Sequence, residues 1–177
     1  MSIEDRPGIV DDKSRIGDWE IDTVIGKGNS GALVTIVERV TSAQVDSMSA
    51  KAVTKTTIML FKPYKESVLS ITAVNGKEFA CHEEISKALS AELYIAYPYS
   101  CWERGLNDNT NGLLRQYFPK STDFKVVSQA KVKRAVNKLN SRPRKNLGFK
   151  NPGVLMAEHR AAVSSLNLDA LRILIRA

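Results

Sequence analysis

Three short β-rich runs open this sequence, and they constrain its fold more than any other feature. The runs cover residues 17–25, 32–40 and 43–49, with a glycine-rich stretch at 26–31 and a turn at 41–42 between them. Runs of this length with turn residues between them predict an antiparallel three-stranded meander. We therefore expect the chain to build a sheet first and to pack its helices against that sheet.

The rest of the sequence alternates between helix-like and strand-like patterns. A nearly continuous apolar run at 68–74 predicts a buried central strand. A helix is expected before it, with Thr54 as N-cap. The inward residues of that helix are expected to be Ile58, Met59 and Phe61. After the central strand we expect a helix at 77–90, a strand at 92–97, a helix at about 103–118, and a helix at 128–140 with the apolar stripe Ala130, Val132, Ala135, Val136 and Leu139.

This order, βββαβαβαα, is that of the ribonuclease H-like fold. It predicts the α/β class, with a mixed five-stranded sheet flanked by helices.

Composition narrows the class of protein. A chain of 177 residues is long enough to bury one core, so one main domain is expected. The net charge of +7 favours a polyanionic partner. Cys81 and Cys101 lack metal-ligand spacing, and His82 and His159 are the only histidines, so no zinc site is expected. Since no apolar run reaches the roughly 20 residues that span a bilayer, we expect a cytoplasmic protein without a membrane partner.

Three motifs carry the candidate chemistry. Residues 17–23 read GDWEIDT, residues 72–79 read TAVNGKEF, and residues 102–112 read WERGLNDNTNG. In the first motif, strand alternation places Glu20 and Asp22 on one face. Together the motifs resemble the catalytic domain of transposases of insertion sequence family 30, which are relatives of the retroviral integrases. The resemblance implies an integrase-type catalytic core that cleaves and joins DNA strands during transposition.

The resemblance also implies which residues form the active site. Asp22 stands at the position of the first catalytic carboxylate. The family has Asp at the second position and Glu at the third, whereas this chain has Val74 and Asp108. The spacing of thirty-three residues between 74 and 108 is the one that the family keeps. Mg²⁺ or Mn²⁺ is the implied cofactor, held by Asp22 and Asp108 and bound weakly or not at all.

These two departures predict an impaired centre. Phosphoryl transfer by two ions needs clustered carboxylates, and valine cannot bind a cation. Asp108 keeps the charge of the expected Glu but has a shorter reach, and a misplacement of about 1 Å can lower a rate on the order of 10²-fold. Glu78 and Glu103 lie nearby in sequence, but Glu78, one turn into the expected helix, is expected to be either solvated or favoured by the dipole at the helix N-terminus.

Two groups of residues are candidates for contacts with DNA. The polar side of the helix at about 103–118 is expected to face DNA outward; a plain amphipathic surface helix is the alternative. A basic tract without acidic residues follows and matches a family motif over 139–148. Such a tract binds phosphates without reading sequence, unless it is merely a solvated face. The candidates are Arg104, Asn107, Asn111 and Arg115 from the helix, and Lys131, Lys133, Arg134, Lys138, Arg142, Arg144 and Lys145 from the tract.

The chain is expected to divide into a leader or linker remnant at 1–14, a catalytic domain at 15–152 and a C-terminal helical tail at 153–177, with order beginning near Ile16. The family carries a helix-turn-helix region ahead of the catalytic domain, and residues 1–14 are too short to build one. The tail is expected to dock on its own domain or to bind a partner. Its apolar stripe is Val163, Leu166, Ala170, Leu171 and Leu174, widened by Leu168 and Ile175.

These observations lead to one main functional hypothesis and two alternatives. The main hypothesis is a transposase catalytic domain acting on DNA and impaired by Val74 and Asp108. The first alternative is a non-catalytic DNA-binding or oligomerising remnant of a truncated transposase. Its partners would be DNA, a second copy of the chain, or an intact transposase in a mixed oligomer. The second alternative is a product without a selected role.

Overall fold

A mixed sheet forms the centre of the molecule. The computed structural model describes residues 1–49, 53–97 and 105–175, with side chains throughout except at 45–49 and 166–175. The sheet has the order β3-β2-β1-β4-β5. The first three strands form an antiparallel meander, as predicted, while β4 and β5 run parallel to β1. The strands are β1 (Asp18–Ile25), β2 (Ala32–Glu38), β3 (Gln44–Ser49), β4 (Ser70–Ala73) and β5 (Glu92–Ile95).

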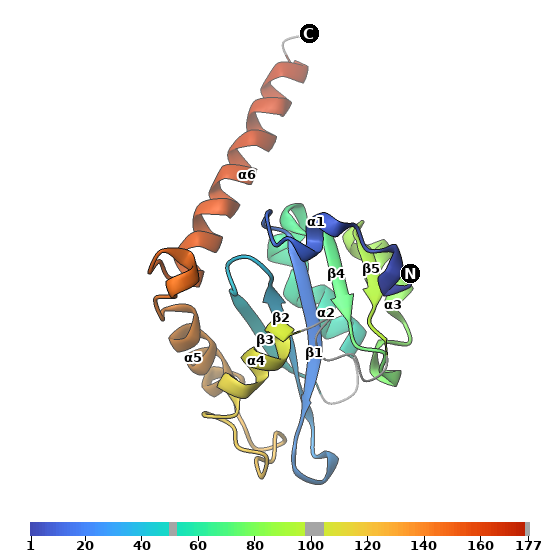
Figure 1. Cartoon of the computed structure of the whole chain (residues 1–177), viewed down its shortest axis with the longest axis vertical. Helices are drawn as coiled ribbons and strands as arrows, with labels where there is room; N and C mark the ends of the chain where they lie inside the picture. The colour runs from blue at the N-terminus through green and yellow to red at the C-terminus, as the bar shows by residue number, and fades with distance from the viewer. Residues whose placement is uncertain (50–52, 98–104, 176–177) are drawn as a thin grey trace.

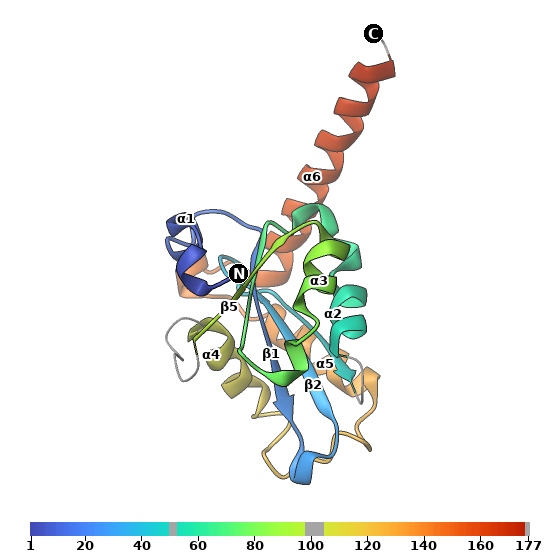
Figure 2. The same cartoon turned by 90° about the vertical axis from the view of Figure 1, so that its right-hand side faces the viewer.

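Helices cover both faces of this sheet (Figures 1 and 2). Two of them, α2 and α3, pack on one face, and α4 lies across the other with α5 beside it. The predicted α/β class, with a mixed sheet flanked by helices, is confirmed. The helices are α1 (Gly8–Asp11), α2 (Val53–Phe61), α3 (His82–Leu89), α4 (Gly105–Leu114), α5 (Gln129–Asn140) and α6 (Pro152–Ile175).

The alternation of side chains in β1 divides the interior into an apolar side and a polar side. Trp19 and Ile21 are fully buried on the face covered by α2 and α3. The Trp19 ring meets Phe61 edge-on at 5.3 Å between centroids, and its Nε1 donates to the Ser67 carbonyl. Strand periodicity turns Glu20 and Asp22 to the opposite face, toward α4. The polar side chains of β1 are thereby directed into the candidate site.

The basic helix α5 is held by its apolar stripe and by both of its ends. Val132 and Leu139 are fully buried in the second apolar cluster, whereas Ala130 is exposed, so its predicted place in the stripe is wrong. Ser128 caps the N-terminus by accepting from the Lys131 amide. At the other end, the Asn140 side chain accepts from the Gln44 N–H and donates to the Gln44 carbonyl, both at 2.9 Å. Asn140 therefore joins α5 to β3.

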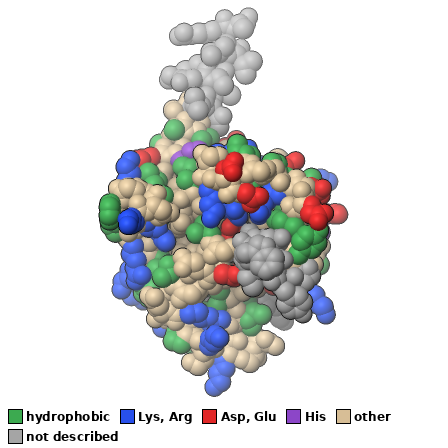
Figure 3. Space-filling view, viewed as in Figure 1, with side chains coloured by type: hydrophobic (Ala, Val, Ile, Leu, Met, Phe, Trp, Pro, Cys, Tyr) green, Lys and Arg blue, Asp and Glu red, His purple; other side chains and the backbone are tan. Residues whose placement is uncertain are grey.

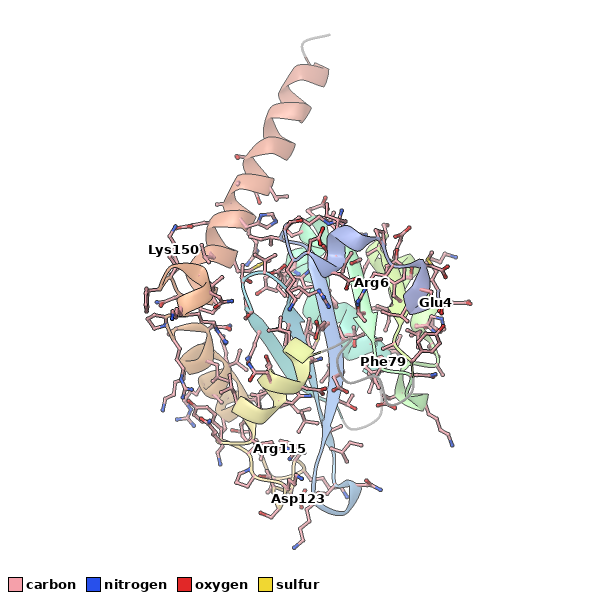
Figure 4. All side chains as sticks on the ribbon, viewed as in Figure 1. Glu4, Arg6, Phe79, Arg115, Asp123 and Lys150 are labelled. Carbon is pink, nitrogen blue, oxygen red and sulfur yellow. The ribbon has the colours of Figure 1, made fainter. Side chains whose placement is uncertain are left out.

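The N-terminal segment is part of the fold, so the expectation that order begins near Ile16 is wrong. Ser2 forms a parallel bridge with Ile95, whose N–H donates to the Met1 carbonyl at 3.0 Å. Ile3 and Val10 are buried. Arg6 lies over β4 (Figure 4), where its Nη1 donates to Thr72 Oγ1 at 3.1 Å. Backbone pairing and apolar burial, neither of which periodicity reveals in so short a segment, fix these residues.

Several predicted element boundaries also need correction. The α2 helix already includes Val53, so Thr54 is not its N-cap, and Met59 points outward with 59% of its surface exposed. The central strand β4 covers only Ser70–Ala73 of the apolar run, and Leu69 just before it is 46% exposed. The helix predicted at 77–90 divides into a 3₁₀ turn at Lys77–Phe79 and α3.

Among its described side chains, the C-terminal helix α6 docks on the domain near its beginning. Met156 is buried in the first apolar cluster, and the Arg160 guanidinium lies 4.8 Å from the centre of the Tyr64 ring. Beyond this region the helix projects away from the sheet (Figure 1). Most of the predicted apolar stripe falls among side chains outside the described residues. Among the described helices, none combines the length and apolar content that crossing a bilayer requires.

A buried carboxylate closes the loop that leads into β1. Glu38 is fully buried and accepts from the amides of Gly17, Val40 and Thr41, and from the Thr41 hydroxyl. Gly17 has a φ of 124°, and a Cβ there would lie 3.0 Å from the Ser67 carbonyl oxygen, so only glycine fits. Burial raises the pKa of Glu38 above its ordinary value, although these hydrogen bonds oppose the shift.

Because the pKa of Glu38 is raised by folding, this group makes stability depend on pH. Between the unfolded and folded pKa values the folded chain binds more protons, so the free energy of unfolding falls as pH rises through that window. The amide of Glu38→Gln does not titrate. We therefore expect the melting temperature of the natural chain minus that of Glu38→Gln to fall as pH rises from about 4 to 7. Thermal unfolding followed by circular dichroism measures this. A rise of this signed difference with pH would contradict the raised pKa of Glu38.

Candidate active site

Asp22 faces α4 from the middle of the sheet. Its Oδ1 accepts from the Thr23 N–H at 2.7 Å, and its Oδ2 accepts from the Asn111 side-chain amide at 3.1 Å. The carboxylate is half-buried. The structure therefore brings together Asp22 and Asn111, two of the residues that the sequence predicted for the site, from positions 89 residues apart.

A buried ion pair beside Asp22 fixes the start of α4. Glu20 is 1% exposed; its Oε2 accepts from the Asn107 N–H at 2.8 Å, and its Oε1 accepts from Arg39 Nη1 at 2.6 Å. Arg39 also donates from Nε to the Val10 carbonyl at 3.1 Å. Burial raises the pKa of Glu20, and the Arg39 charge opposes this shift. A carboxylate that accepts from an amide in the first turn of a helix also interacts favourably with the helix dipole.

Sequence reasoning did not assign this role to Glu20 or Arg39. The available signal was the strand alternation that placed Glu20 on the same face as Asp22. Arg39 gave no comparable signal, because its contact with Glu20 depends on the register of β1 against β2.

Val74 lies at the position expected for the second carboxylate. It directly follows Ala73, which pairs with Ile21 in the parallel β1–β4 ladder. The strand register therefore places Val74 level with Asp22. Its side chain packs against the first apolar cluster. A cavity of about 280 Å³ opens beside it and is lined by the turn at Asn75 and Gly76 and by Lys77 and His82. An apolar side chain therefore occupies this place.

The first turn of α4 carries Asp108, whose side chain is exposed. Asn111 and Arg115 follow at helical spacing on the same stripe. Arg115 lies at the far end of α4 (Figure 4) and donates to the Ile25 carbonyl at 3.0 Å. Arg104 lies outside the described residues.

Asn107 does not face outward, so its predicted contact with DNA is wrong. The residue is fully buried, and its Oδ1 accepts from the Thr35 hydroxyl at 3.1 Å. Helical spacing places it with Thr110 and Leu114 on the side of α4 that packs on the sheet. Its Oδ1 is therefore satisfied by β2 instead of by solvent, whereas its Nδ2 is buried without a hydrogen-bond partner among the described residues.

Glu78 lies in the first turn of the 3₁₀ helix Lys77–Phe79, so of its two expected environments the helix N-terminus holds and full solvation is wrong. It is half-buried, and its Oε1 accepts from the Thr23 hydroxyl at 3.0 Å. Because Thr23 and Asp22 are neighbours in a strand, their side chains point to opposite faces. Glu78 therefore lies across the sheet from Asp22. Glu103, the other acidic residue considered, lies outside the described residues.

The donor set fits a divalent ion only in part. Asp22 and Asp108 are oxygen donors of the kind that Mg²⁺ and Mn²⁺ prefer. In the part of the chain that the structure describes, no three His, Cys, Asp or Glu side chains converge closely enough to hold a metal ion. Asp22 also uses both carboxylate oxygens in hydrogen bonds, so coordination would compete with them.

The predicted basic residues form a surface beside this site. Lys and Arg side chains gather along the left margin of the face in Figure 3, where α5 lies. Arg144 differs from the others because it is half-buried, and burial lowers the pKa of its guanidinium. The exposed members are Lys131, Lys133, Arg134, Lys138, Arg142 and Lys145.

Comparison with solved structures defines the class of fold. The catalytic core domain of bovine immunodeficiency virus (BIV) integrase superposes with a TM-score of 0.61 at 17% identity, covering 82% of this chain and 96% of that domain. A chain of the simian T-cell lymphotropic virus intasome in complex with the PP2A regulatory subunit B56 gamma gives a TM-score of 0.56 at 17% identity, with 70% of this chain and 48% of that chain covered. The chain therefore has the ribonuclease H-like fold of an integrase catalytic core.

Sequence comparison identifies relatives of the chain. It is 47% identical over 156 residues to the transposase for insertion sequence element IS4351 from Bacteroides fragilis, covering 86% of this chain and 48% of the relative. It is 36% identical over 158 residues to the transposase for IS30A from Escherichia coli, covering 85% and 40%. No family model matches the chain. The chain is thus a relative of the transposases of insertion sequence family 30, as its motifs predicted, and it spans about half the length of these relatives.

Proposed function

We propose that the chain is a transposase catalytic domain, which acts on DNA by strand cleavage and strand transfer. The observation that carries this proposal is the 47% identity to a named transposase over 86% of the chain. The placement of Asp22 against the first turns of α4 supports it, because carboxylates from a strand and a helix are thereby brought to one side of the sheet. Residues 15–152 are the proposed catalytic unit.

We further propose that the centre is impaired. Mg²⁺ or Mn²⁺ would be held by Asp22 and Asp108, and such an ion activates the attacking oxygen and stabilises the leaving oxygen in phosphoryl transfer. Val74 contributes no ligand and packs into the apolar cluster instead. With one carboxylate fewer, the site attracts divalent cations less strongly.

A second candidate function is a non-catalytic DNA-binding or oligomerising remnant. The apolar environment of Val74 favours it, because a domain that has lost catalysis can still keep its fold and its basic surface. Such a remnant would form complexes with DNA, with a second copy, or with an intact transposase.

A plasmid nicking assay with Mn²⁺ tests the proposal. We expect the natural chain to nick no faster than Asp22→Ala. The double variant Val74→Asp with Asp108→Glu is expected to nick supercoiled DNA, because it supplies the carboxylates that two ions require. The matched control is the same double variant carrying Asp22→Ala, which should be inactive. Nicking by the natural chain that depends on Asp22 would contradict the impairment, whereas an inactive double variant would favour the non-catalytic remnant.

A further inference from the structure

The short helix α1 lies on the same face of the sheet as α4 (Figures 1 and 2). Its last two residues contact the guanidinium of Arg39: the Val10 carbonyl accepts from Nε at 3.1 Å, and Asp11 Oδ1 lies 3.6 Å from Nη2. The remaining nitrogen, Nη1, donates to Glu20. Because the guanidinium is a rigid planar fork, contacts on two of its nitrogens orient the third. The helix α1 therefore directs Arg39 toward Glu20.

A second buried cation holds Asp11 in this position. Arg6 pairs with the same carboxylate oxygen of Asp11, and 6% of the Arg6 side chain is exposed. Its Nη1 donates to Thr72 Oγ1, and Thr72 pairs with Glu20 in the β1–β4 ladder. Exposed ion pairs usually contribute little, because two long side chains must be immobilised to form them. Here the guanidiniums on both sides of Asp11 are already ordered by burial, although Asp11 itself is exposed.

The contacts of Glu20 lead from Arg39 to the first turn of α4. The first four N–H groups of a helix have no partner within the helix, and Asn107 is the third residue of α4. Glu20 supplies the missing acceptor for the Asn107 N–H. The next residue is Asp108, and Asn111, one turn further along, donates to Asp22. The place of Asp108 relative to Asp22 thus depends on where Glu20 holds this turn.

We propose that Asp11 is a positioning residue for the candidate active site, and that it acts on the first turn of α4 through Arg39 and Glu20. A carboxylate misplaced by about 1 Å can lower a rate on the order of 10²-fold, so a residue outside the site can control its activity. The catalytic consequence rests on the proposed function, whereas the placement of α4 does not. The N-terminal segment, expected to be a leader or linker remnant, belongs in this assignment to the framework of the site.

The first test is amide hydrogen exchange, measured residue by residue by NMR on the whole chain. Asp11→Asn keeps the shape of the side chain but removes the charge that faces Arg39. We expect the Asn107 N–H to exchange at least about tenfold faster in this variant, because hydrogen bonds to charged groups contribute enough for a change of that size when their geometry is lost. Amides of the β1–β4 ladder should be unchanged. The matched control is Asp12→Asn, which removes the same charge from the neighbouring exposed residue and should leave Asn107 unchanged.

Two results of the exchange experiment would overturn the proposal. One is equal exchange of the Asn107 N–H in Asp11→Asn and Asp12→Asn. The other is faster exchange spread evenly over the sheet, which would assign Asp11 a role in overall stability alone. Faster exchange confined to the first turn of α4 supports the proposal.

The second test adds Asp11→Asn to the double variant Val74→Asp with Asp108→Glu and measures plasmid nicking with Mn²⁺. We expect kcat to fall at least about tenfold with little change in KM, because the lost contacts set the geometry of the reacting groups and not the affinity for DNA. Asp12→Asn in the same background should leave kcat unchanged. A raised KM with an unaltered kcat would overturn the positioning role. If the double variant itself does not nick, the proposed function fails, and the exchange of the Asn107 N–H still decides the role of Asp11.

Discussion

Glu20→Ala is expected to lower the free energy of unfolding by about 3–5 kcal/mol, the usual consequence of removing one partner of a buried ion pair. The substitution leaves the buried Arg39 guanidinium without its 2.6 Å partner and removes the acceptor of the Asn107 N–H. Both losses act in the same direction, because the acidic contact that Arg39 keeps is the longer one of its Nη2 with the exposed Asp11 at 3.6 Å, and an unsatisfied donor is costly in the interior. Denaturant unfolding measures the change.

Two control variants separate the buried pair from the loss of a negative charge. Glu158→Ala removes an exposed carboxylate on α6 and should change stability by no more than about 0.5 kcal/mol. Glu20→Gln keeps an acceptor for Asn107 while removing the charge, so an intermediate loss is expected. Equal effects of Glu20→Ala and Glu158→Ala would contradict the assigned role of the ion pair.

The second large effect is expected from restoring the missing ligand. Val74→Asp with Asp108→Glu should raise the affinity for Mn²⁺ at least tenfold, which corresponds to about 1.4 kcal/mol. Isothermal titration calorimetry measures the affinity. Thermal unfolding provides a second readout, because an ion at 100 times its Kd stabilises the folded state by about 2.7 kcal/mol. Without metal the double variant should unfold at a lower temperature than the natural chain, since an Asp at 74 adjoins the apolar cluster.

The matched control for metal affinity is Val74→Asn with Asp108→Glu. It has nearly the same shape as the double variant but lacks the restored charge, so it should bind Mn²⁺ little better than the natural chain. Similar affinities in the two double variants would mean that position 74 does not reach the ion.

Patterns that repeat along the chain made much of the fold predictable. The meander followed from alternation and turn residues, and the same alternation placed Glu20 and Asp22 on one face. The α5 stripe was predictable because Val132, Val136 and Leu139 follow helical spacing. The resemblance to transposases predicted that Asp22 and the helix α4 contribute to one site, and the hydrogen bond between Asp22 and Asn111 agrees with this prediction.

The missed features depend on contacts between distant segments. The Glu20–Arg39 pair requires the register of two strands, and the N-terminal segment is fixed by pairing with β5, far along the chain. Asn107 was expected to face outward because it is polar, but the helix turns it toward Thr35, whose hydroxyl donates to its Oδ1. Polarity alone did not reveal which side of α4 packs on the sheet.

Ile95 and Gln44, on the two outer strands of the sheet, have consequences for self-association. An exposed edge strand offers free N–H and carbonyl groups that can pair with another chain, which is a common route to aggregation. Here the Met1 carbonyl accepts a hydrogen bond from the Ile95 N–H. The Asn140 side chain hydrogen-bonds to both the N–H and the carbonyl of Gln44, as the backbone of a neighbouring strand would. The N-terminal segment and the end of α5 thus occupy edge-strand backbone groups and disfavour the addition of a strand from another chain at these positions.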